Sequence, residues 1–172
     1  KETTEKQVSL TIAFTSHSPR TFYRKAIRTS PLTRLPEHRR AQASVMNYSP
    51  YCSRDADEVT QLFNATFSDS EGPAEGALVG RLARDLINTT EANDLYGFVA
   101  RDDAQIAGSI FFSRIKFAYA INGFILAPVA VRTDVQGRGV GQALIKHGLD
   151  ALSKRGVELV LTYGDPAFYA KV

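Results

Sequence analysis

The stretch DVQGRGVGQALI, residues 134–145, decides how this chain folds. Gly137, Gly139 and Gly141 lie directly before a run of helical spacing. Glycine lowers stability inside regular structure, so a cluster of glycines at a helix start needs a reason. Two reasons stay open on these residues alone. The glycines allow the helix to pack closely against a sheet, or they leave room for an anion beside the free N–H groups of the first helical turn.

The segments around this stretch predict a mixed α/β domain. Apolar or alternating runs predict strands at 45–52, 95–102, 105–117, 123–133 and 157–164. Apolar spacing of three and four residues predicts helices after Ser53, after Pro73, from Gly139 to Arg155 and after Pro166. We therefore expect a central sheet with flanking helices. Pro128 removes a ladder donor from its strand, which predicts a bulge or a splayed strand there.

Charge divides the 172 residues into two parts. Residues 1–45 carry nine Lys/Arg and three Asp/Glu, whereas residues 46–172 carry twelve and fifteen. We therefore predict a basic, flexible extension over 1–45 and one folded domain over 46–172. The acidic balance of the domain argues against nucleic-acid binding, except through the basic residues 18–45. Within the extension, KQVSLTIAF (residues 6–14) alternates like a short strand.

The composition also limits where the protein works. Cys52 is the single cysteine, so the chain forms no internal disulfide, as is usual in a reducing compartment. No apolar run reaches the roughly 20 residues that a membrane helix needs. We expect a cytoplasmic protein without a membrane partner.

Two common phosphate motifs fit the glycines poorly. A Walker-type loop needs Lys and Ser/Thr after its last glycine, where this chain has Gln142 and Ala143. A dinucleotide fingerprint has different glycine spacing and an acidic residue about 20 positions later. Gln136–Gly141 instead matches the Gln/Arg-x-x-Gly-x-Gly/Ala motif of the GCN5-related N-acetyltransferases (GNAT). Residues 127–172 resemble the cofactor-binding half of that family, most closely a bacterial subgroup of small acetyltransferases with a Gly-Asp-Pro-x-x-Tyr segment.

The resemblance implies roles for particular residues. The pyrophosphate of acetyl-CoA would lie on the backbone N–H groups of Gln136, Gly137, Arg138, Gly139, Val140 and Gly141. The pantetheine arm would pair with Val129, Ala130 and Val131, and the N–H of Ala130 or Val131 would stabilise the oxyanion. Tyr169 would donate a proton to the leaving thiolate.

The implied activity is acetyl transfer from acetyl-CoA, as cosubstrate, to an amine of a small molecule or peptide, without a metal. A non-catalytic acyl-CoA-binding or remnant domain is the alternative. Further candidates are weaker: Glu71, Glu75, Glu91 and Asp165 are acidic residues in the regions of a base or acceptor. We expect His147 to lie at the surface, Tyr163 to belong to the core, and Cys52 to be a half-buried structural thiol.

Family members normally continue with two further strands after the tyrosine helix, whereas the sequence ends at Val172. The resemblance therefore predicts a sheet that lacks its last C-terminal strands. An uncovered edge would favour a homodimer. The alternating segment KQVSLTIAF is a candidate to fill that edge instead.

Overall fold

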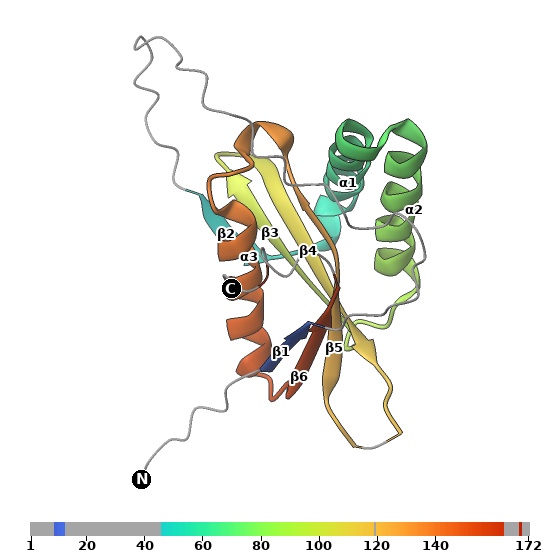
Figure 1. The fold of residues 1–172 in the computed structure, drawn as a ribbon, viewed down its shortest axis with the longest axis vertical. Helices are drawn as coiled ribbons and strands as arrows, with labels where there is room; N and C mark the ends of the chain where they lie inside the picture. The colour runs from blue at the N-terminus through green and yellow to red at the C-terminus, as the bar shows by residue number, and fades with distance from the viewer. Residues whose placement is uncertain (1–8, 13–45, 119, 164–168, 170–172) are drawn as a thin grey trace.

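A computed structural model describes the backbone of residues 9–12 and the residues 46–118, 120–163 and 169. These residues form a six-stranded mixed sheet in the order β1-β6-β5-β4-β3-β2 (Figure 1). The strands are β1 (Ser9–Ile12), β2 (Asn47–Pro50), β3 (Leu95–Asp102), β4 (Gln105–Ile115), β5 (Gly123–Val131) and β6 (Leu159–Thr162). β2 to β5 are antiparallel neighbours, and β6 runs parallel to both β5 and β1.

Helices cover both faces of this sheet. α1 (Ala56–Glu71) and α2 (Pro73–Thr89) stand on one face, and α3 (Val140–Ser153) lies on the other (Figure 1). Two short 3-10 turns, Ser53–Asp55 and Thr133–Val135, precede α1 and α3. The predicted mixed sheet with flanking helices is confirmed, and the element order from residue 46 to β6 follows the sequence-based expectation.

Side-chain alternation along β4 divides the core into two layers. Ile110 and Phe112 point toward α3, whereas Phe111 between them points toward α1. All three side chains are fully buried. Because successive residues of a strand face opposite sides, one apolar strand supplies both layers of the core. The sheet thereby holds α3 in a fixed position relative to β5.

A two-residue turn connects the antiparallel strands β3 and β4 as a hairpin. β3 ends at Asp102 and β4 begins at Gln105, so Asp103 and Ala104 form the turn. Asp103 has a φ of +53°, a left-handed conformation that Asp and Asn tolerate better than most residues. The hairpin ends close to the segment that connects β5 to α3.

The N-terminal strand lies at the edge of the sheet next to β6. Ser9–Ile12 pair in parallel with Leu159–Thr162. This pairing confirms a strand within KQVSLTIAF and places it at the edge that the sequence left uncovered. β1 thereby removes, over these four residues, the exposed edge on which a homodimer was expected. The rest of residues 1–45 lies outside the described residues, so the proposed domain boundary at residue 45 stays a prediction.

Candidate functional site

The first feature of the site is the fork where β5 leaves β6. β5 pairs with β6 only over Gly123–Ile125, although its ladder with β4 continues to Val131. The β4–β5 ladder shifts register between Ile110 and Phe112, where β5 contributes an extra residue next to Pro128. The bulge predicted from Pro128 is confirmed, and it lies where the two parallel strands diverge.

Thr162 of β6 contacts β5 across the fork. Its hydroxyl donates a hydrogen bond of 3.3 Å to the carbonyl oxygen of Leu126, one residue beyond the ladder. From Leu126 to Val131, the edge of β5 that points away from β4 has no ladder partner in the described part of the chain. An extended ligand can therefore add to this edge as a further strand.

Hydrogen bonding along β5 identifies the N–H groups that face this open edge. The N–H of Arg132 donates to Ala107 O at 2.8 Å and therefore points toward β4. Because bonding alternates along an antiparallel ladder, the N–H of Ala130 also points toward β4 and that of Val131 points away. The carbonyl of Val131 agrees with this, since it accepts from Nε2 of Gln136 at 2.8 Å. Of the two oxyanion donors considered, the ladder favours Val131.

Val129 shares the orientation of Val131, since the two are separated by one residue on the strand. Both side chains pack against the core layer beneath α3. Ala130 instead belongs to the layer beneath α1 and is almost fully buried. Residues 129 and 131 therefore supply the backbone groups of the open edge, while residue 130 supplies packing.

The motif loop between β5 and α3 contains two left-handed glycines. Gly137 and Gly139 have φ of +77° and +81°, a conformation that residues with a Cβ rarely adopt. A Cβ on either glycine would meet no atom within 4 Å. Close packing is instead the role of Gly148, whose Cβ would lie 2.6 Å from the ring of Phe112. At Gly137 and Gly139 the backbone is bare and accessible, as an anion site requires.

The start of α3 adds free donors to this loop. Gly139 is the N-cap residue, no side chain caps the helix, and its first turn contains no acidic residue. The N–H of Ala143 makes the first helical bond, to Gly139 O at 3.0 Å. The N–H groups of Val140, Gly141 and Gln142 therefore have no acceptor within the helix. Together with the helix dipole they favour a negatively charged ligand.

The two arginines near the loop have different surroundings. Arg138 lies inside the loop and is exposed. Arg132 is paired with Asp134 at 2.6 Å and with Asp102 at 3.3 Å. The hydrogen bond to Asp134 raises the pKa of Arg132, and the same bond lowers the pKa of Asp134. Arg138 is therefore the arginine with charge available to a ligand.

Tyr169 places a phenol at the fork. Its ring is buried in the core layer beneath α3, and its hydroxyl is hydrogen-bonded to Thr162. Burial raises the pKa of Tyr169 above its ordinary value of 10.0 and outweighs the opposing effect of that hydrogen bond. The phenol is therefore protonated at neutral pH. Tyr163 was expected in the core but is 42% exposed, because it follows the last residue of β6.

Two other expectations concern residues away from the fork. His147 was expected at the surface, but it is half-buried, with its ring 5.6 Å from that of Phe98 and 6.1 Å from that of Tyr48. The helix α3 covers the sheet more widely than its apolar stripe suggested. Cys52 is half-buried, and its thiol donates to Asp55 Oδ2 at 3.2 Å, which fits the structural role expected for it.

The acidic candidates do not gather at the fork. Glu71 ends α1, Glu75 lies in the first turn of α2, and Glu91 is exposed in the turn before β3. One carboxylate oxygen of Glu75 is buried and has no hydrogen-bond partner in the described part of the chain. Asp165 lies outside the described residues. No general base is therefore identified among them.

Membrane and metal features were also searched within the described ranges. No helix there has the length and apolarity to cross a membrane. In the same ranges, no three His, Cys, Asp or Glu side chains form a group that could hold a metal ion.

Comparison with known proteins assigns the chain to a family. A family model described as an acetyltransferase (GNAT) domain matches residues 93–172. The uncharacterized N-acetyltransferase YhbS of Escherichia coli K12 is 34% identical over 119 residues, which cover 68% of this chain and 66% of YhbS. The uncharacterized N-acetyltransferase YjhQ of the same strain is 30% identical over 120 residues, covering 68% and 62%. The chain thus spans slightly less than two thirds of these curated relatives.

Solved structures agree with this assignment. The crystal structure of YhbS from Escherichia coli in complex with CoA has a TM-score of 0.60 and 30% identity, covering 78% of this chain and 71% of that one. A GNAT family acetyltransferase from Brucella melitensis in complex with acetyl-CoA has a TM-score of 0.62 and 27% identity, covering 74% and 81%. This chain belongs to the GCN5-related N-acetyltransferase family.

Proposed function

We propose that this chain is an N-acetyltransferase that uses acetyl-CoA to acetylate an amine of a small molecule or peptide. The observation that carries the proposal is the position of the fork directly before the bare glycine loop. The open edge of β5 ends at Val131, and the loop begins five residues later at Gln136. One extended ligand with a phosphate group can therefore contact both. The complexes of the two structural relatives with CoA and acetyl-CoA support this choice of ligand.

The residues fit such a ligand chemically. The pyrophosphate would be held by the backbone N–H groups of Gly137 to Gly141, with Arg138 as the nearby cation. The pantetheine amides would pair with the backbone of Val129 and Val131, the residues whose polar groups face the open edge. Acetyl-CoA supplies the acetyl group as a thioester, which an amine can attack.

Two groups of the chain would then assist the transfer. The N–H of Val131 would donate to the carbonyl oxygen on which negative charge develops. The hydroxyl of Tyr169 would give its proton to the departing sulfur. Because burial raises its pKa, the phenol stays protonated at neutral pH and can donate a hydrogen bond to the negative charge that develops on the sulfur. Tyrosinate is a stronger base than a thiolate, so a Tyr169 that gave up its proton would regain one, for example from the ammonium form of the product. The amine must be neutral when it attacks the thioester. Glu75, whose carboxylate has one buried oxygen, is a candidate for attracting an acceptor that arrives as a cation.

A matched pair of substitutions tests the cofactor site. Gly139→Asp and Gly139→Asn have nearly the same shape, and both residues tolerate a left-handed conformation. Asp at the N-cap is favourable for the helix, so it does not weaken the fold relative to Asn. In calorimetric titration with acetyl-CoA, we expect Gly139→Asp to bind at least tenfold more weakly than Gly139→Asn, because its charge repels the pyrophosphate.

Equal affinity of the two variants for acetyl-CoA would show that the pyrophosphate does not bind at this loop. Failure of the folded parent chain to bind acetyl-CoA would overturn the proposed function itself. Binding without turnover on any amine tested would instead favour the non-catalytic acyl-CoA-binding domain. The nucleic-acid partner considered for residues 18–45 stays a prediction, because those residues lie outside the described ranges.

A further inference from the structure

Arg132 directly follows β5 and begins the connection to the glycine loop. Its guanidinium uses all three nitrogens. Nε and Nη2 donate to the two carboxylate oxygens of Asp134 at 2.6 and 3.1 Å. Nη2 also donates to Asp102 at 3.3 Å, and Nη1 donates to Gln105 at 3.2 Å. Two carboxylates therefore offset the charge of Arg132, which makes it a poor ligand for a phosphate.

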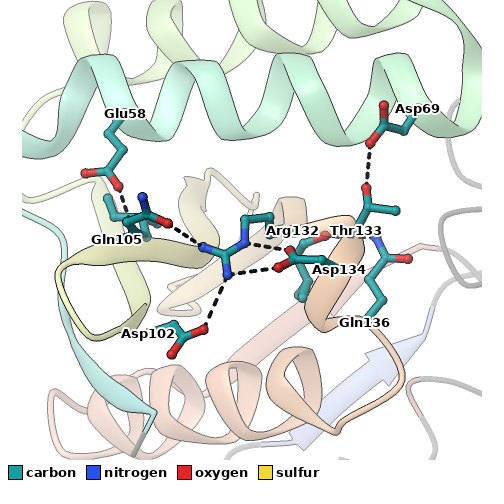
Figure 2. A network of polar contacts seen from close by, with 10 residues as sticks. Glu58, Asp69, Asp102, Gln105, Arg132, Thr133, Asp134 and Gln136 are labelled. Carbon is teal, nitrogen blue, oxygen red and sulfur yellow. Dashed lines mark hydrogen bonds and ion pairs between the residues drawn. The ribbon is translucent and has the colours of Figure 1, made fainter. Parts of the chain in front are cut away.

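These contacts connect distant parts of the chain. Figure 2 shows Arg132 between Asp102 and Gln105 on one side and Asp134 on the other. Asp102 and Gln105 flank the β3–β4 turn, whereas Asp134 lies in the 3-10 turn before the loop. The backbone N–H of Arg132 also bonds to Ala107 of β4. The guanidinium therefore fastens the start of the loop connection to the β3–β4 hairpin.

Two further contacts hold the same connection. The hydroxyl of Thr133 donates to Asp69 of α1 at 2.7 Å (Figure 2). The side-chain amide of Gln136 donates to Val131 O at 2.8 Å. The connection is thus attached to the hairpin, to α1 and to β5. These attachments come from the side chains of residues within a five-residue stretch, 132–136.

The glycine loop has little packing of its own. A Cβ at Gly137 or Gly139 would touch nothing within 4 Å, and both residues, with Arg138 between them, are exposed. Such a loop is conformationally free unless its two ends are fixed. α3 fixes the C-terminal end. The polar contacts of residues 132–136, together with the buried side chain of Val135, fix the N-terminal end.

We propose that Arg132, held by Asp102 and Asp134, is a positioning residue that orders the glycine loop for the pyrophosphate of acetyl-CoA. The proposal rests on the proposed function and adds a determinant of cofactor affinity that does not touch the cofactor. A positioning role and a phosphate-binding role for Arg132 predict opposite changes in acetyl-CoA affinity when a neighbouring carboxylate is removed. If charge attraction were its role, removing the neighbouring carboxylate would strengthen cofactor binding. If positioning is its role, removing the carboxylate weakens binding.

The test is calorimetric titration of the full chain with acetyl-CoA at a temperature well below the melting temperature. We expect Asp134→Asn and Arg132→Gln each to weaken binding about five- to tenfold, because the loop must then be ordered at the expense of binding energy. The double variant should bind acetyl-CoA no more weakly than Arg132→Gln, because the two substitutions break the same contact between Arg132 and Asp134. Arg132→Lys keeps the charge but loses the forked geometry, so it should also bind weakly.

Thr133 and Arg84 supply independent variants. Thr133→Val breaks the contact with Asp69 at an exposed position and should weaken binding, whereas Thr133→Ser keeps the hydroxyl and should bind normally. Arg84→Gln breaks an exposed ion pair with Asp57 on the helices α1 and α2 and should not change binding. Tighter or unchanged binding by Asp134→Asn, or full binding by Arg132→Lys, would overturn the proposal. If the parent chain binds acetyl-CoA, these results overturn only the positioning role of Arg132 and leave the proposed function intact. If the parent chain does not bind acetyl-CoA, the proposed function itself is overturned.

Discussion

Substitution of Gly148 by alanine tests the contact between α3 and the sheet. A Cβ at this position would lie 2.6 and 2.9 Å from two ring atoms of Phe112 and 3.1 Å from Cδ1 of Ile110. Both neighbours are fully buried, so neither has free space to move into. Overpacking of this kind costs about 1–3 kcal/mol. Alanine in place of a helical glycine returns about 1 kcal/mol.

The net expectation for Gly148→Ala is a loss of about 1 kcal/mol in the free energy of unfolding. For a chain of this size, that corresponds to a melting temperature about 2–4 °C lower. Thermal unfolding followed by circular dichroism measures it. Lys146→Ala is the matched control, because residue 146 lies on the exposed side of the same helix and should leave the melting temperature unchanged or slightly raised.

The same substitution in a Phe112→Leu variant tests whether the contact with Phe112 causes the loss of stability. In Phe112→Leu, the smaller side chain leaves space for the new methyl group, so the cost of Gly148→Ala should largely disappear. A melting temperature raised by Gly148→Ala in the parent chain, as helix propensity alone predicts, would refute the close approach of α3 to β4.

Three further predictions concern the fork, the start of α1 and the edge of the sheet. Tyr169→Phe should keep the affinity for acetyl-CoA and lower turnover about 100-fold or more, measured by calorimetry and steady-state kinetics; equal turnover would leave Tyr169 a packing residue. Burial raises the pKa of Asp55, but hydrogen bonds from Cys52 and Arg101 outweigh it and hold the pKa below 3.8. The contribution of Asp55 to stability is therefore complete above about pH 4 and falls as the pH drops through the folded-state pKa. In urea unfolding, the stability difference between the parent and Asp55→Asn should be about 1–3 kcal/mol at pH 7 and smaller at pH 3; a constant difference would contradict this. Removal of residues 1–12 should lower the melting temperature and produce concentration-dependent association in light scattering, because it uncovers β6; a stable monomer would speak against β1.

The sequence predicted those features that depend on neighbours along the chain. The alternation in residues 95–131 identified β3 to β5, and Pro128 identified the bulge, because a missing N–H disrupts a ladder wherever the strand pairs. The glycine spacing identified the loop and, through the family resemblance, led to the proposal that it binds the pyrophosphate of acetyl-CoA. The segment KQVSLTIAF was recognised as a strand because alternation is a local property.

Other features depended on contacts between residues distant in the sequence. Arg132 is close to the glycine loop in the sequence, but its charge is paired with Asp102, 30 positions earlier, and with Asp134. No sequence pattern singles out Thr162, although its hydroxyl donates a hydrogen bond at the fork to the carbonyl oxygen of Leu126, 36 positions earlier. Neither pair has a signal in composition or periodicity. Such contacts form only when the sheet brings separate strands together.

The choice between Ala130 and Val131 as the residue with a free N–H group also depended on contacts between distant parts of the chain. Both residues are small or apolar and lie in one strand, so the sequence could not tell which N–H is free. Strand pairing identified the free N–H group, because alternate N–H groups of β5 donate to β4 and the others point toward the open edge. Local spacing thus determined the elements, the bulge and the glycine loop. Only the register of the sheet and its long-range polar contacts determined which backbone groups face the open edge of β5 and which residues contact the connection to the glycine loop.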